Sequence, residues 1–275
     1  MATETLNAAS NPALANKIAQ EALTVVPQEA SGPTQVVIPS LPDTTVELPG
    51  GLYDPFDNTI ETFAEVRELN GADEEAIVKI TDPGKALLAI LERATVSVGG
   101  SPATKDLLST MLAGDRETLL LAIRKATFGS EIVMEATCSR CPELQSFTID
   151  LNKDLEIKVL EDRIEDRTFT VKIKSGIAKV TLPNGDTQEK LINASNKNSA
   201  ELDTLLLTSC VSEINDTPVL TPNTIKNLGI KDRRDILEEI ANRNPGPLLS
   251  EIKKACGNCG QEVDLPLTLA DLFRS

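Results

Sequence analysis

Two pairs of cysteines carry the clearest chemical signal in this sequence of 275 residues. Cys138 and Cys141 are separated by two residues, and Cys256 and Cys259 repeat that spacing. Two intervening residues let one tight turn direct both thiolates toward a single ion, and Zn²⁺ prefers four such ligands at tetrahedral corners. The chain contains no histidine, so a zinc site built from the usual nitrogen and sulfur ligands needs all four cysteines. The spacing therefore predicts one four-cysteine site with Zn²⁺ as a structural cofactor.

Other interpretations of the cysteines remain open from the sequence alone. The pairs could be unrelated reduced thiols or two thiol-redox motifs, and iron could occupy the same four thiolates. A thioredoxin-like motif sits between a strand and the start of a helix, whereas both pairs here precede the alternating pattern of a strand. Gly257 and Gly260 favour a tight second turn, while the first pair runs into Pro142. Cys210, in an apolar helical segment, is predicted to be an ordinary buried cysteine.

The wide separation of the two pairs predicts what the ion would do. Closing a longer loop costs only slowly more entropy, so distant pairs can share one ion. Such an ion would tie one half of the chain to the other. Four sulfur ligands leave no open position for water, which is typical of a structural site and not of a catalytic one.

The elements that must position the pairs occur twice in the same order. The matching segments are 96–100 with 211–216, 115–123 with 232–240, and 138–141 with 256–259. All three keep an offset of about 115 to 118 residues, which chance rarely arranges. The sequence therefore predicts an α+β fold: two related lobes of short strands and helices, joined by the four-cysteine zinc site.

Composition and turn signals set the expected boundaries. We expect a flexible N-terminal arm over 1–35, a first α+β lobe over 36–151 ending in a CxxC knuckle, a charged linker over 152–168, and a second α+β lobe over 169–275 ending in a CxxC knuckle. The local pattern also predicts a strand that ends at Pro49-Gly50-Gly51, a turn over 182–186, and a helix capped by Asp115.

Composition also limits the classes of function. Hydrophobic residues make up 40% and charged residues 25%, which are globular proportions, and the scarcity of aromatics predicts a thin core helped by a metal staple. The net charge of −15 with no basic patch argues against nucleic acid as a partner. No apolar run of ~18 residues and no signal peptide are present, so we expect no membrane partner and synthesis in the cytosol. Without histidine, Ser-His and Cys-His nucleophile systems are excluded, and no phosphate-binding loop is visible, so we expect no enzyme.

Several of these motifs occur, in this order, in a known family. They are the helix at 114–124 followed by Thr127-Phe128-Gly129, the first cysteine pair, the turn at 182–186, the strand at 211–214, the second cysteine pair and the apolar end at 269–273. Together they resemble the baseplate hub and assembly proteins of T-even-like bacteriophages, from Val36 to Phe273. The resemblance implies a virion or tail-assembly protein that contacts other baseplate subunits and has no catalytic activity. Only the four cysteines are carried over as site residues.

The leading hypothesis is a structural component of a bacteriophage tail baseplate, a zinc-stapled adaptor that links the hub to surrounding tail proteins. Its expected location is the virion tail baseplate after synthesis in the host cytoplasm, in multiple copies of a symmetric assembly. The alternative is a transient tail-assembly chaperone that the virion does not retain. The sequence does not separate these two, because both need binding surfaces and neither needs chemistry. At the C-terminus, Leu272 and Phe273 could fill a neighbour's pocket or pack on the chain itself.

Overall fold

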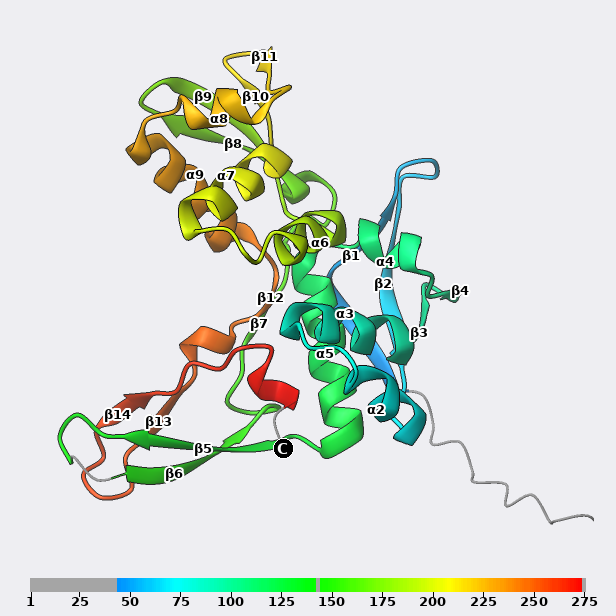
Figure 1. The fold of residues 1–275 in the computed structure, drawn as a ribbon, viewed down its shortest axis with the longest axis vertical. Coiled ribbons are helices and arrows are strands. Elements are labelled where there is room, and N and C mark those ends of the chain that lie inside the picture. Colours follow the sequence, from blue (N-terminus) through cyan, green and yellow to red (C-terminus); the bar gives the residue numbers. More distant parts are fainter. Residues whose placement is uncertain (1–43, 142–143, 274–275) are drawn as a thin grey trace, which may run out of the picture. The chain divides into compact units, whose positions relative to one another are not determined.

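A computed structural model describes residues 44–141 and 144–273 of the chain (Figure 1). Contacts divide the chain into Met1–Ser40 and Leu41–Ser275, and the description concerns the second of these units. The arm predicted over 1–35 lies outside the described residues. Helices and short strands alternate through the described part, so the predicted α+β class is confirmed.

The elements of the first half (residues 44–150) are β1 (Thr44–Asp54), β2 (Thr59–Val66), α2 (Gly71–Ile77), α3 (Pro83–Ala94), β3 (Thr95–Val98), β4 (Ser101–Pro102), α4 (Lys105–Thr110), α5 (Ala113–Phe128), β5 (Glu131–Thr137) and β6 (Leu144–Asp150). After β7 (Ile157–Lys158) and η2 (Glu165–Arg167), the second half (residues 168–264) contains β8 (Thr168–Ile173), β9 (Gly176–Thr181), α6 (Gly185–Asn193), α7 (Ser199–Cys210), β10 (Val211–Ile214), β11 (Thr217–Pro218), α8 (Pro222–Lys226), α9 (Ile230–Arg243), β12 (Gly246–Pro247), η3 (Leu249–Glu251), β13 (Lys253–Ala255) and β14 (Glu262–Asp264). The described chain ends in η4 (Asp271–Phe273).

Two antiparallel sheets in the described residues have the same strand order. The first is β1-β2-β3-β4 and the second is β8-β9-β10-β11, each read along the chain. In the first sheet Val66 pairs with Thr95, and β3 then skips one residue. In the second sheet Val180 pairs with Val211, and β10 skips one residue at the same point. The sequence comparison aligned Val96 with Val211. Strand register shows instead that Thr95 is the residue equivalent to Val211.

The turn after this irregular strand is also the same in both sheets. Gly99 and Gly100 have φ angles of 58° and 77°, and Asn215 and Asp216 have φ angles of 49° and 61°. Two successive residues with positive φ form the hairpin turn whose twist matches that of paired strands. Glycine, asparagine and aspartate are the residues that adopt this conformation at the lowest cost.

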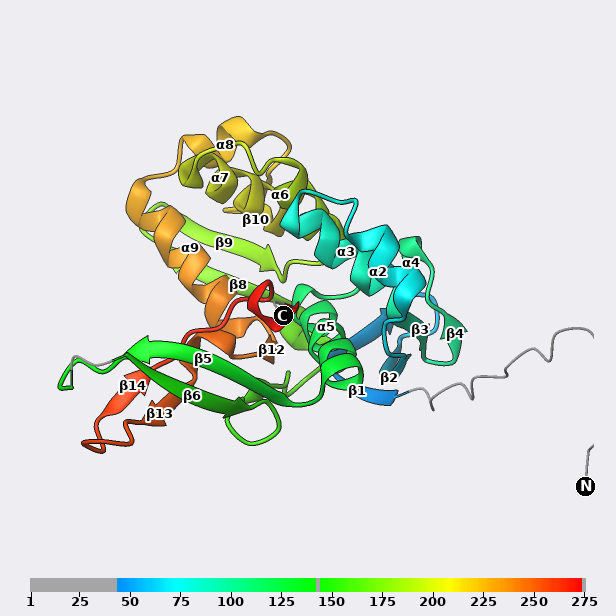
Figure 2. The same cartoon turned by 60° about the horizontal axis from the view of Figure 1, so that its bottom comes forward.

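Helix α5 lies at the centre of the packing, as both views of the ribbon show (Figures 1 and 2). Leu119 and Ile123 join the core under the first sheet, and Leu121 joins a third cluster under the cysteine hairpins. Leu112, just before the helix, joins the core under the second sheet. Residues on most faces of α5 are buried, the polar Asp115, Arg116 and Arg124 among them, so the helix and its N-cap residue together connect the three cores.

Asp115 is not the cap of this helix, which corrects the prediction. The helix begins at Ala113, and its N-cap residue is Leu112. The carboxylate of Asp115 instead accepts hydrogen bonds from the backbone N–H groups of Gly50, at 2.7 Å, and Gly51, at 3.3 Å. The helix starts earlier than predicted because its first residue is already engaged: the Ala113 N–H donates to the carbonyl of Pro183 at 2.9 Å.

Two turn signals were also misread. The strand predicted to end at Pro49-Gly50-Gly51 continues to Asp54, with an irregular register between Glu47 and Leu52. Gly185, predicted within a turn, is the first residue of α6, and the side chain of Asn184 caps that helix. Glycine and asparagine serve bulges and caps as readily as turns, so composition alone does not separate the three.

The stretch predicted as a charged linker lies along β1. The Leu160 N–H donates to the Pro49 carbonyl at 3.1 Å. The Arg167 guanidinium donates to the carbonyls of Gly50 and Gly51, the former at 2.9 Å. Within the same stretch β7 pairs with β12, so its backbone and side chains bind elements from both halves of the chain.

Candidate metal centre

Each cysteine pair lies at the tip of a two-stranded antiparallel hairpin. Strands β5 and β6 pair from Glu131–Asp150 to Thr137–Leu144, and the first pair follows β5 directly. Strands β13 and β14 pair up to Ala255–Glu262, and the second pair lies between them. The two hairpins lie side by side in both views of the ribbon (Figures 1 and 2). The strands predicted after each pair are therefore confirmed.

Backbone geometry shapes the turn of each pair differently. In the second turn Gly260 has a φ angle of 71°, and its N–H donates to the Cys256 carbonyl at 2.8 Å. Positive φ is the conformation that glycine adopts freely, as the sequence predicted for this turn. In the first turn the Arg140 N–H donates to the Cys138 sulfur at 3.4 Å. The second turn is thus closed by a backbone hydrogen bond between Gly260 and Cys256, and the first places a backbone N–H group against the Cys138 sulfur.

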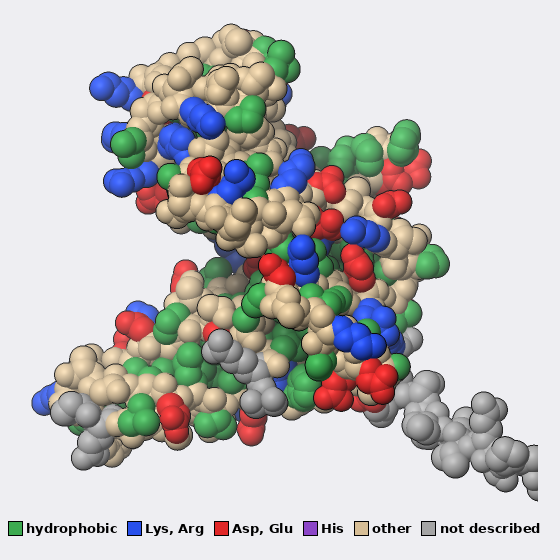
Figure 3. All heavy atoms as spheres, in the orientation of Figure 1, with side chains coloured by type: hydrophobic (Ala, Val, Ile, Leu, Met, Phe, Trp, Pro, Cys, Tyr) green, Lys and Arg blue, Asp and Glu red, His purple; other side chains and the backbone are tan. Residues whose placement is uncertain are grey.

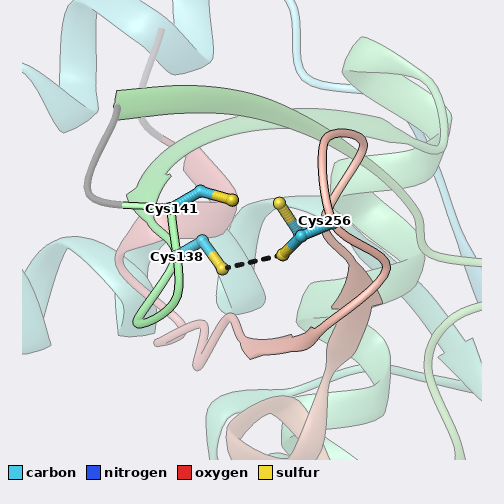
Figure 4. A group of neighbouring side chains, drawn as sticks. Cys138, Cys141 and Cys256 are labelled. Carbon is cyan, nitrogen blue, oxygen red and sulfur yellow. Dashed lines mark hydrogen bonds between the residues drawn. The ribbon is translucent and has the colours of Figure 1, made fainter.

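The four sulfur atoms come together although the pairs are far apart in sequence. All four Sγ atoms lie within 4.8 Å of one another. Those of Cys138 and Cys259 are 3.8 Å apart, and Figure 4 shows Cys138 and Cys141 directed toward Cys256. A disulfide needs about 2.05 Å, whereas four sulfurs at ~2.3 Å from one tetrahedral ion lie about 3.8 Å apart. The cluster therefore fits a metal ion and does not fit a pair of disulfides.

The surroundings of the cluster are apolar. Cys138 and Cys256 are buried, while Cys141 and Cys259 are half-buried and pack against the same hydrophobic cluster. The other buried members of the cluster are Leu121, Phe147, Ile149, Leu151, Leu155, Leu249, Ile252, Val263, Leu265, Leu267 and Leu272. A low-dielectric shell of this kind keeps water away from metal–sulfur bonds.

Electrostatics around the sulfurs favours one thiolate and opposes another. Backbone N–H groups of Asn258 and then Cys259 lower the pKa of Cys256, with a further contribution from the Gln145 side chain. A hydrogen bond with Cys259, burial and the neighbouring thiols raise the pKa of Cys141. Several thiolates this close repel one another unless a cation lies among them. The arrangement can therefore bind a divalent metal ion.

Gln145 is a site residue that the sequence reasoning missed. Its Nε2 atom donates to the Cys256 sulfur at 3.3 Å. The residue lies in β6, opposite Ala136 of β5. Hydrogen bonds from outside the ligand set orient metal ligands and tune them. The only sequence signal is its place in the strand after the first pair, which does not reveal that it faces the second.

Two further residues singled out in the sequence, Cys210 and Leu272, are both buried. Cys210 lies buried in the core under the second sheet, apart from the four clustered cysteines, as predicted. Burial raises the pKa of its thiol to about 12, which makes it unreactive. Leu272 is fully buried in the cluster beneath the cysteines, and Phe273 packs against it. The C-terminal apolar residues therefore pack on the chain itself.

Two carboxylates with raised pKa values lie on α5. Burial raises the pKa of Asp115 to about 6 and that of Glu117 to about 7. Positions i and i+2 of a helix face different directions, so they do not form a facing acid–base pair. Asp115 is also engaged by the backbone of Gly50 and Gly51.

Within the described residues, no helix is long and apolar enough to cross a membrane.

A family model described as T4 bacteriophage base plate protein matches residues 64–274, a segment that contains all four clustered cysteines. No curated protein and no solved structure matches the chain.

Proposed function

We propose, from the premise that this chain belongs to the T4 bacteriophage base plate protein family, that it is a structural part of a phage tail baseplate. Its finer role in this proposal is that of an adaptor that joins the hub to the surrounding tail proteins. The observation that carries the proposal is the family match over most of the folded chain. A baseplate family implies contacts with other tail proteins and a place in the virion tail, after synthesis in the host cytoplasm.

The proposed cofactor is one structural Zn²⁺ ion held by Cys138, Cys141, Cys256 and Cys259. The spacing of the sulfurs and the apolar shell support it. A site closed by four thiolates stabilises a fold outright and leaves no position for a substrate. Its role is then to hold the two hairpins together, which gives an assembly part rigidity that a core poor in aromatics does not supply.

We also propose that the chain is an internal duplication of two α+β lobes, 36–151 and 169–275, joined by 152–168. The support is the repeated strand order, the repeated skip in register and the repeated positive-φ turn. In this arrangement each lobe supplies its last hairpin to the metal. The ion then joins equivalent ends of two related units, and a multi-copy symmetric assembly would repeat that unit.

Mass spectrometry of purified phage particles tests the proposal. A structural part is expected at a fixed stoichiometry with known tail subunits in particles that have been separated from lysate. A chain that is abundant in the infected lysate but absent from finished particles would overturn the structural role. That result would favour the transient assembly chaperone instead.

A further inference from the structure

The open face of the first sheet is acidic around a single exposed ring. One face of β1 and β2 packs on the core, and the opposite face carries the exposed side chains of Thr45, Glu47, Glu61, Phe63 and Glu65. Phe63 is 55% exposed, and Glu47 lies directly across from it on β1. Three carboxylates and one aromatic ring therefore share this surface.

The open face of the second sheet carries the opposite charge around a single exposed aliphatic side chain. Ile177 is 56% exposed, and Lys172 lies directly across from it on β8. Lys179 follows Ile177 on the same face of β9, opposite Thr170. Glu213 of β10 lies across from Lys179 on this face, so two lysines and one carboxylate surround Ile177 where the first sheet has three carboxylates around Phe63.

Strand register shows that the two apolar residues occupy equivalent positions. The N–H of Gly99, the first residue of the first turn, donates to the Phe63 carbonyl at 2.9 Å. The N–H of Asn215, the first residue of the equivalent turn, donates to the Ile177 carbonyl at 2.9 Å. Phe63 therefore corresponds to Ile177.

The neighbours then correspond as well, with their charges reversed. Glu47 pairs with Phe63 as Lys172 pairs with Ile177. Two residues after the apolar position, Glu65 in β2 takes the place of Lys179 in β9. A surface that presents carboxylates at these positions is complementary in charge to one that presents lysines there.

We propose that the acidic face of the first sheet binds the basic face of the second sheet in another copy of this chain. Phe63 and Ile177 would form the apolar centre of the contact, and the carboxylates and lysines its charged rim. Sheets pack face to face in this way in β-sandwiches. The contact joins two different surfaces, so it is heterologous and leaves a free basic face on one copy and a free acidic face on the other.

The charges on both faces are available for such a contact. Glu47 is paired with Arg163 at 3.0 Å, yet its side chain remains 65% exposed. Lys179 is paired with Glu213 at 3.6 Å, and its side chain remains 48% exposed. Ion pairs this exposed are weak, so both side chains can reorient toward an opposite charge at little cost.

The first hairpin extends the acidic surface further. Beyond the sheet, β1 and β2 reach a tip that contains Asp54, Phe56 and Asp57, and Phe56 is 95% exposed. Acidic and hydrophobic side chains lie together over this hairpin in the space-filling view (Figure 3). In the second sheet the corresponding turn is short, at Lys174 and Ser175. The longer hairpin thus adds carboxylates to the same side of the charge contrast.

Sedimentation velocity of the purified full-length chain tests the inference. The average mass is expected to rise with protein concentration and to fall with added salt, because salt screens exposed charges. Glu65→Lys and Lys179→Glu each reverse one charge at matching positions of the two faces and should each weaken association by about tenfold. An equimolar mixture of the two variants should associate as the wild type does, because each contact between unlike variants again joins opposite charges at positions 65 and 179.

Charge reversals elsewhere provide the matched controls. Glu75→Lys on α2 and Lys226→Glu on α8 change exposed side chains outside both faces, and they should leave association unchanged. A chain that stays monomeric at every concentration, or controls that act as strongly as the face variants, would overturn the inference. Association that persists through both face reversals would do the same. Sedimentation of the purified chain and mass spectrometry of phage particles are separate tests. A chain that is monomeric in the first but present in finished particles in the second would contradict this inference and leave the baseplate role unaffected.

Discussion

Asp115 in α5 and Asp232 in α9 occupy matching positions, and the two halves of the chain treat them differently. Asp115 accepts backbone N–H groups from Gly50 and Gly51 in β1. Asp232 accepts the N–H groups of the two residues in the β8–β9 turn, Lys174 at 2.8 Å and Ser175 at 3.1 Å. In both halves a helix carboxylate thus holds the hairpin against its own core.

One hydroxyl group separates the two sites. The Ser175 hydroxyl also donates to Asp232 and, as the largest cause, lowers its pKa. By strand register the matching residue in the first half is Gly50, which has no hydroxyl. Among the described residues, the Oδ2 atom of Asp115 is buried with no hydrogen-bond partner. Burial then outweighs the two backbone bonds and raises the pKa of Asp115 to about 6.

Packing against Leu112 explains why the first half lacks that hydroxyl. A Cβ atom on Gly50 would lie 3.0 Å from Oδ2 of Asp115, but it would also lie 2.6 Å from Cδ1 of Leu112. A side chain at this position would therefore collide with Leu112. The first half is left without the donor that Ser175 supplies in the second half.

The largest effect is expected from the proposed metal ion, which would hold the two cysteine hairpins together. Cys138→Ser and Cys256→Ser should each abolish zinc binding and lower the free energy of unfolding by more than ~4 kcal/mol, because a structural zinc site contributes its binding energy to folding. Zinc content by elemental mass spectrometry and thermal unfolding with and without a chelator measure this. Cys210→Ser, which touches no sulfur of the cluster, serves as the control for losing a buried cysteine.

A shared site makes a second demand on the same variants. Combining Cys138→Ser with Cys256→Ser should be no worse than either change alone, because one lost ligand already opens the site. Additive losses of unfolding free energy would mean that the two pairs act independently. A Cys256→Ser variant that unfolds as the wild type does would contradict a structural zinc site.

The next effect is expected where the backbone of α5 at Gly114 closely approaches the backbone at Pro245. A Cβ atom on Gly114 would lie 1.6 Å from the Pro245 carbonyl oxygen. Because the obstacle is backbone, Gly114→Ala should cost about 3 kcal/mol. The matching residue of α9 is Lys231, which is exposed and paired with Asp235. Lys231→Ala should cost less than ~0.5 kcal/mol, and urea unfolding of the two variants compares them directly. Equal losses of unfolding free energy in the two variants would contradict a close backbone contact at Gly114.

The pH dependence of stability should differ between the two aspartates. The folded pKa of Asp115, about 6, lies above the unfolded value of about 3.9, so protonation favours the folded state. Its contribution should be greatest below pH ~4 and decline by about 2–3 kcal/mol as the pH rises through ~6. Asp115→Asn should remove that decline. Asp232 has a lowered pKa, so its contribution should instead be present above pH ~4 and be lost in acid.

Urea unfolding between pH ~4 and ~7 measures the Asp115 effect, and its extension to pH ~2 measures the Asp232 effect. Both are taken as differences from the wild type at each pH, so that any common effect of a bound metal cancels. Arg163 and Arg167 lie near Asp115 and oppose the rise in its pKa. A flat difference between wild type and Asp115→Asn across this range would show that these arginines, and not burial, dominate the site.

The smallest effect is expected at the matching turns. Asp216 has a φ angle of 61° where the first sheet has Gly100. Asp216→Gly should stabilise the protein by ~0.5 kcal/mol, and Gly100→Asp should destabilise it by a similar amount. Asn215→Gly is different, because the Asn215 side chain accepts from the Ile177 N–H and donates to the Ser175 carbonyl. That variant should lose stability although it relieves the same backbone angle, and thermal unfolding ranks the three.

Much of this protein could be predicted from local sequence. The paired cysteine spacing, the α+β class and the repeated order of elements all follow from features within a few residues of one another, such as spacing, alternation and turn residues. The resemblance to phage baseplate proteins rests on the same order of local motifs, and the family match supports a baseplate protein. These features survive in any tertiary arrangement, so the sequence was enough to find them.

The tertiary structure decided which of those features meet. The convergence of four sulfurs within 4.8 Å depends on two hairpins that are distant in sequence. The role of Asp115 changed because its carboxylate reaches a strand 65 residues away, and Gln145 became a site residue through its contact with Cys256. The charge contrast between the two sheet faces depended on strand register. Register and packing set the direction of each side chain, and a one-residue slip reverses it, so local pattern does not determine these contacts.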